Sequence, residues 1–73
     1  KIEIQGHTDD LGNDASNLAL SQDRAYSVME YLSERGLKLS RMKFKGYGET
    51  QPKVPNDSDK NRAINRRTDF KIL

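Results

Sequence analysis

The chain has 73 residues, of which 33% are hydrophobic and 33% are charged, as is typical of one small domain with a modest core. Cysteine is absent, which excludes disulfides and thiolate metal sites. The 13 basic and 11 acidic residues leave a net charge of only +2, which argues against a general polyanion binder, and no apolar run approaches the roughly 20 residues that cross a bilayer.

The first expected element is a strand over residues 1–5. Polar and apolar side chains alternate there, and the β-branched Ile2 and Ile4 share one face. Residues 6–14 contain two glycines together with Asp and Asn, which favour turns. We therefore expect a loop that leaves the carboxyl end of this strand.

A helix is predicted from Ala15 to Arg35. Asp14 or Ser16 is expected to cap its start, and Gly36 supplies a residue suited to its end. Apolar residues recur at spacings of three, four and seven, as one buried stripe requires. They are Leu18, Ala25, Val28, Met29 and Leu32.

The pattern of residues in the second half of the chain predicts two more strands. Residues 42–47 alternate like the first strand, and residues 49–59 carry both prolines, which indicates an irregular connection. A short helix is expected to start at Asp57 or Ser58 and to run through Ile64. Residues 68–73 alternate again, and we expect Phe70 and Ile72 to point inward.

This order of elements predicts an α/β fold, a two-layer sandwich with a mixed β-sheet and helices on one face. The first two strands are joined through a helix, which favours a right-handed parallel crossover. The chain is expected to form one domain over residues 1–73.

The candidate catalytic residues give no complete catalytic set. Asp9 and Asp10 are adjacent on a turn and would seldom face one substrate bond from two sides, so loop structure or ligand binding is the favoured interpretation. His7 is the only histidine, which excludes a His-rich metal site, and we find no exposed serine elbow for a triad. We expect His7 to be a hydrogen-bonded structural residue, and we predict neither a metal nor a cofactor.

Two features could indicate phosphate binding. The run Gly46–Gly48 lacks the third glycine of a phosphate loop and is better explained as a tight strand exit. The segment Lys60–Arg67 has four cations and no acid, so composition alone leaves a nucleic-acid patch open beside a solvated or ion-paired face.

Several motifs and single residues span nearly the whole chain in a fixed order: Ile4–Asp9 (IQGHTD), Asn17–Ala25 (NLALSQDRA), Val28–Leu32 (VMEYL), Gly36, Gly46–Glu49 (GYGE), Pro52, Asn56 and Asn61–Arg67 (NRAINRR). Together they resemble the OmpA-like peptidoglycan-binding family, which includes outer membrane protein A, the peptidoglycan-associated lipoproteins and the flagellar stator anchors. The resemblance implies a non-catalytic module that anchors the outer membrane or an envelope complex to the cell wall. It also implies a periplasmic location and a membrane-associated parent protein.

The resemblance further implies binding of diaminopimelate in the peptidoglycan stem peptide, and the chemistry of Asp9 and Arg24 fits that ligand. The free end of diaminopimelate is an amino-acid zwitterion. A guanidinium can hold its carboxylate through two parallel hydrogen bonds while an aspartate accepts from its ammonium. By the same resemblance, Thr8 lines the pocket, Asn17 contacts the ligand and Arg66 flanks it. Arg62 and Arg67 are expected to be structural.

The chain departs from the family pattern in two places. Asn61 stands where the family usually has glycine before the arginine, which predicts a left-handed Asn conformation. Family domains also begin with a further strand and helix that this chain lacks, so a sheet edge and apolar surface should be exposed. Either the chain is trimmed from a longer protein, or a partner copy supplies the missing part by domain swapping in a homodimer.

Two other functions remain as alternatives to cell-wall binding. A peptidoglycan-processing enzyme would need a metal ligand set, a thiol or a separated carboxylate pair, and a nucleic-acid-binding module would use the basic segment. The acid in the proposed site distinguishes the hypotheses, since a phosphate-binding groove has no use for Asp9.

Overall fold

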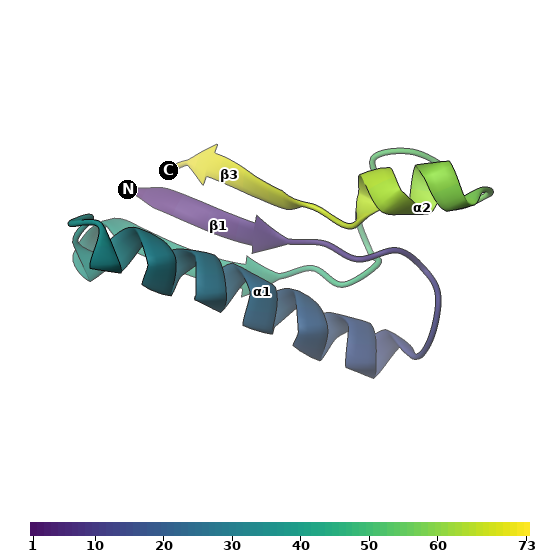
Figure 1. The fold of residues 1–73 in the computed structure, drawn as a ribbon, viewed down its shortest axis with the longest axis horizontal. Coiled ribbons are helices and arrows are strands. Elements are labelled where there is room, and N and C mark those ends of the chain that lie inside the picture. The colour runs from purple at the N-terminus through teal and green to yellow at the C-terminus, as the bar shows by residue number, and fades with distance from the viewer.

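The computed structural model describes all residues from 1 to 73 and contains a three-stranded sheet with one long helix across it. Strand β1 (Ile2–Gly6) lies in the centre, parallel to β2 (Met42–Gly46) and antiparallel to β3 (Thr68–Ile72). Figure 1 shows the two chain termini side by side at one end of the sheet. The predicted mixed sheet and parallel crossover are confirmed, and the predicted strands agree with the structure to within one residue at each end.

Helix α1 (Asp14–Glu34) begins one residue earlier than predicted, and its cap is Asn13 rather than Asp14 or Ser16. The Asn13 side chain accepts hydrogen bonds from the backbone N–H groups of Ala15 and Ser16, at 2.8 and 3.2 Å. Asn, Asp and Ser are all good caps, so composition could not choose among these neighbours. Asp14 instead lies in the first turn, where the helix dipole favours its charge.

The carboxyl end of α1 terminates at Gly36, as predicted. Gly36 has a positive φ of 101°, and the N–H groups of Gly36 and Leu37 donate to the carbonyls of Ser33 and Leu32. These two bonds satisfy carbonyls that the helix would otherwise leave free. A short 3-10 helix (Leu39–Arg41) then leads into β2.

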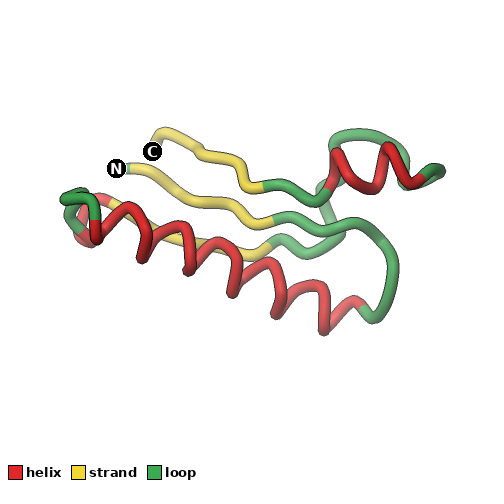
Figure 2. The backbone as a smooth tube through the Cα atoms, in the orientation of Figure 1, coloured by secondary structure: helices red, strands yellow, loops and turns green.

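Helix α1 packs mainly on β1 and β2. Ile4, Ala25 and Met42 form the buried centre of this contact, with partly buried neighbours around them at Ile2, Val28, Met29, Leu32 and Leu37. Helix α2 (Asp59–Asn65) lies beyond the end of the sheet rather than over its face, as Figure 2 shows. Ser58 caps α2 through a bond from the Asn61 N–H, which confirms one of the two predicted starts.

Three side chains are placed differently from the sequence prediction. Phe70 and Ile72 lie on the same face of the sheet as Ile4, but they are 58% and 81% exposed because α1 packs mainly on β1 and β2. Leu18 is also exposed, since it lies on the flank of α1 beside the segment that follows β2. Strand β3 therefore presents an uncovered apolar face, and no strand pairs with its outer edge.

Candidate functional site

The predicted site residues lie where β1 and β2 end side by side. The two loops that leave these strands are tied together, because the Thr8 N–H donates to the Gly48 carbonyl at 2.9 Å. Helix α1 crosses this edge closely at Ser21, whose hydroxyl accepts from the Gly48 N–H at 2.9 Å and donates to the Leu18 carbonyl at 2.7 Å. This crossing places the first half of α1 beside the loop that contains Asp9.

Asp9 is held in a fixed orientation and is only 8% exposed. Its Oδ1 accepts from the Leu11 N–H at 3.0 Å, and its Oδ2 accepts from Arg66 Nη1 at 2.7 Å. The hydrogen bond from Arg66 lowers the pKa of Asp9, and the Leu11 N–H acts in the same direction against the opposing effect of burial. Asp9 is therefore an ionised carboxylate beside a cation.

Thr8 and Asn17 are both buried against the Asp9 loop. The Thr8 hydroxyl donates to the Asp9 carbonyl at 2.9 Å. Asn17 Nδ2 donates to the carbonyls of Asp9 and Leu11, at 3.4 and 3.0 Å. Both side chains thus shape the loop that carries Asp9, and their direct contact with a ligand stays a prediction.

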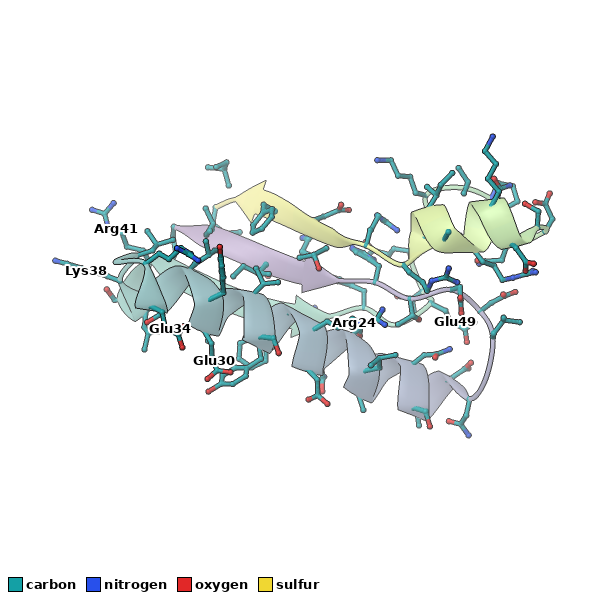
Figure 3. The ribbon with its side chains drawn as sticks, in the orientation of Figure 1. Arg24, Glu30, Glu34, Lys38, Arg41 and Glu49 are labelled. Atoms are coloured by element: carbon teal, nitrogen blue, oxygen red, sulfur yellow. The ribbon has the colours of Figure 1, made fainter.

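Arg24 is exposed, and the structure gives it no hydrogen bond or ion pair. It lies seven residues after Asn17, on a similar side of α1 and about 10 Å further along the helix axis. Figure 3 shows its side chain directed toward the end of the molecule where Glu49 lies. The structure therefore pairs Asp9 with Arg66, not with Arg24, and leaves the Arg24 guanidinium free.

The basic segment is folded into ion pairs. Arg62 contacts Asp59 at 2.5 Å, and Arg67 contacts Asp69 at 3.0 Å and donates to the Asn65 and Gln51 carbonyls. These contacts agree with the structural role predicted for both arginines.

The prediction for Asn61 was wrong. No residue other than glycine has a positive φ, and Asn61 lies inside α2. Its side chain donates to Asp57 Oδ1 at 2.8 Å. Asn61 therefore has an ordinary helical conformation where a left-handed one was predicted.

His7 is structural but is not hydrogen-bonded through its ring, which corrects the prediction. The ring is 1% exposed, neither of its nitrogens has a hydrogen-bond partner, and Nε2 lies 3.6 Å from Asp69 Oδ2. It stacks on Tyr47 with centroids 5.3 Å apart and an interplanar angle of 9°. Burial, followed by the charge of Arg67, lowers the pKa of His7.

A cavity of about 270 Å³ lies next to this site, between the start of α1 and the segment after β2. Neither Asp9 nor Arg24 lines it. Asp14 and Glu49 stand at its wall, and the Asp14 carboxyl, burial and the charges of Asp10 and Asp9 raise the pKa of Glu49. Several acids therefore gather at this end of the molecule, while no group of three His, Cys, Asp or Glu residues could hold a metal ion.

Sequence analysis missed two buried polar residues that build the site. Ser21 lies where α1 crosses the ends of β1 and β2, and Asn65 is fully buried beneath the connection that leads to α2. Asn65 Oδ1 accepts from the N–H groups of Lys53 and Val54, while its Nδ2 donates to the Val54 carbonyl and to Asn56 Oδ1. Hydrophobic periodicity cannot mark such positions, because the side chains are polar.

Comparison with known proteins identifies one family and several relatives. Residues 1–66 match the model of the OmpA family. The chain is 42% identical to outer membrane porin F of Pseudomonas fluorescens over 71 residues, covering 97% of this chain and 22% of the porin. It is also 43% identical to a stretch of the photosystem I P700 chlorophyll a apoprotein A2 of Gloeobacter violaceus, covering 97% of this chain and 9% of that protein.

Solved structures with the same fold come from two kinds of envelope protein. The peptidoglycan-associated lipoprotein of Burkholderia pseudomallei superposes with a TM-score of 0.91 at 38% identity, covering 94% of this chain and 58% of that chain. The C-terminal domain of Helicobacter pylori MotB superposes with a TM-score of 0.90 at 38% identity, covering 96% of this chain and 54% of that domain. The chain therefore spans a little over half of these two structures.

Proposed function

The chain belongs to the OmpA family, and we propose that it binds peptidoglycan without turnover, holding the diaminopimelate of the stem peptide between Asp9 and Arg24. The name of the Burkholderia relative supports the ligand class, since that protein is peptidoglycan-associated. Porin F is an outer-membrane protein and the compared part of MotB includes its periplasmic domain, which supports a place in the periplasm. There the parent protein would anchor the outer membrane or an envelope complex to the wall.

The observation that carries the proposal is the charge arrangement around Asp9. Its carboxylate is ionised and oriented by Arg66 and Leu11, so it can accept hydrogen bonds from a ligand ammonium. Arg24 has no ion-pair partner and lies on a similar side of α1 to Asn17, which contacts the Asp9 loop, so its guanidinium can bind the ligand carboxylate through two parallel hydrogen bonds. A zwitterion placed between them would satisfy both charges.

Arg66 has a second role in this proposal. Its exposed guanidinium can keep one bond to Asp9 and still attract another carboxylate of the stem peptide. A phosphate track fits this segment less well, because Arg62, Arg66 and Arg67 each have an acidic partner. Binding of nucleic acid would require breaking or weakening those pairs.

A co-sedimentation experiment tests the proposed function. The purified chain is mixed with insoluble peptidoglycan sacculi that contain diaminopimelate, and heparin or duplex DNA is added as a competitor. We expect the chain to sediment with the sacculi and the polyanions to compete poorly. Failure to sediment, or efficient displacement by both polyanions, would contradict the proposal. Release of soluble wall fragments would instead indicate an enzyme.

A further inference from the structure

The second half of α1 carries a second concave surface. Its residue Tyr26 follows Arg24 by two positions, which corresponds to about 200° around the helix, so the groove and Arg24 lie on opposite sides of α1. It is a groove of about 350 Å³ between the last turns of α1 and the short 3-10 helix. Thirteen residues separate Asn17 from Glu30 along α1, which corresponds to about 20 Å. The groove is lined by Tyr26, Met29, Glu30, Ser33, Glu34 and Leu39.

The apolar side chains of this groove are exposed to solvent. Tyr26 and Leu39 are 43% and 57% exposed, and Tyr26 packs edge-on against the exposed Phe44 with centroids 5.2 Å apart. These side chains form one continuous surface rather than isolated exposed residues. Such clusters of rigid aromatic and aliphatic groups characterise the centres of protein interfaces.

The charges at the rim of this groove are unfavourable for the isolated chain. Glu30 and Glu34 are one helical turn apart, a spacing at which like charges repel. Both lie in the last part of α1, where the helix dipole disfavours negative charge, and the last turn contains no basic residue. Neither glutamate makes an ion pair.

Nearby cations do not relieve this repulsion. The Arg35 guanidinium lies 4.2 Å from the centre of the Tyr31 ring. Figure 3 shows Lys38 and Arg41 projecting from the end of the molecule, away from Glu30 and Glu34. The acidic rim therefore remains without a positive counterpart beside an exposed apolar floor.

We propose that this groove docks a basic amphipathic segment of another protein, with a large apolar side chain on the floor and Lys or Arg against Glu30 and Glu34. Charge complementarity selects this occupant, because added cations would remove the like-charge repulsion at the rim. The groove has room for one or two side chains. Since the groove and Arg24 lie on opposite sides of α1, the chain could hold the cell wall and this partner at the same time.

A titration followed by NMR tests the proposal on the 15N-labelled chain. The probe is a synthetic amphipathic peptide with leucines on one face and lysines beside them, and a second peptide carries glutamate in place of every lysine. We expect the lysine peptide to shift the amide signals of residues 26–34 and of Leu39, and the glutamate peptide to leave them unchanged. Added salt should weaken the binding.

Matched variants distinguish an effect of charges at the groove from an effect of the overall charge of the chain. Glu30→Gln combined with Glu34→Gln should weaken the lysine peptide about tenfold, whereas Asp23→Asn combined with Asp57→Asn, which removes the same charge elsewhere, should change it by less than about twofold. Leu39→Ala should also weaken binding without unfolding the chain, because Leu39 is largely exposed.

Three results would overturn the proposal. The first is equal binding of the two peptides, and the second is equal loss in the two double variants. The third is a set of groove signals that shift with protein concentration in the absence of peptide, which would identify a second copy of the chain as the occupant.

Discussion

Replacing Gly6 by alanine should separate α1 from the sheet at the point where they come closest. Gly6 is the last residue of β1, and a Cβ built there would overlap the Ser21 carbonyl oxygen and lie 2.8 Å from the Ser21 carbonyl carbon. Favourable contacts between such atoms need about 3.5 Å or more. Because the obstacle is helix backbone rather than a flexible side chain, α1 would have to move by on the order of 1 Å.

The expected loss of stability is large for this chain. Overpacking costs about 1–3 kcal/mol in ordinary cores, and a clash with backbone should reach the upper end, about 3 kcal/mol. A domain of this length has a total stability of roughly 4–11 kcal/mol. The midpoint of thermal unfolding should therefore fall by roughly 12–24 °C. The same movement would pull Asn17 from the Asp9 carbonyl, so binding should weaken as well.

Urea unfolding of Gly6→Ala measures this effect, with Gly36→Ala as the control. Gly36 has a positive φ, but nothing lies within 4 Å of a Cβ placed there, so alanine should cost only about 1 kcal/mol through backbone strain. A Gly6→Ala variant no less stable than Gly36→Ala would refute the close crossing of α1 over β1.

Two further predictions concern the proposed site, and a third concerns the pH dependence of stability. Arg24→Lys should bind stem peptide poorly in a calorimetric titration, because an ammonium cannot reproduce the two-bond fork; full retention would mean that Arg24 acts only as a diffuse charge. Arg66→Ala should weaken binding more than Lys60→Ala, and equal losses that vary with salt would instead indicate a generic cationic patch. The lowered pKa of buried His7 means that the unfolded chain binds the proton more tightly, so stability should fall as pH drops below the ordinary histidine pKa of about 6.5. His7→Phe, which keeps a ring against Tyr47, should flatten that dependence in urea titrations between about pH 5 and pH 8, and an unchanged slope would assign it to another group.

Local sequence patterns predicted the helices and strands better than they predicted which residues are buried. Alternation of side chains identified all three strands, because a period of two depends only on neighbouring residues. The same alternation placed Phe70 on the correct face, opposite Ile4 in the sheet register, but could not reveal that α1 packs mainly on β1 and β2. Burial depends on which elements meet, and that information is not local.

The candidate site was likewise predicted only in part, because its contacts join distant parts of the chain. Motif resemblance selected Asp9, Arg24 and Arg66, yet the ion pair that forms joins Asp9 to Arg66 across 57 positions of sequence. No spacing rule links residues so far apart in the chain. The buried Ser21 was also missed, because hydrophobic periodicity identifies a buried position only where its side chain is apolar.

The most direct test of peptidoglycan binding is isothermal titration calorimetry with a stem peptide that ends in diaminopimelate. The chain should bind this peptide, and Asp9→Ala and Arg24→Ala should each abolish measurable heat, because either change leaves one ligand charge desolvated and unpaired. Circular dichroism of both variants checks that the fold is retained. Near-native affinity in either folded variant would contradict the assignment of the site.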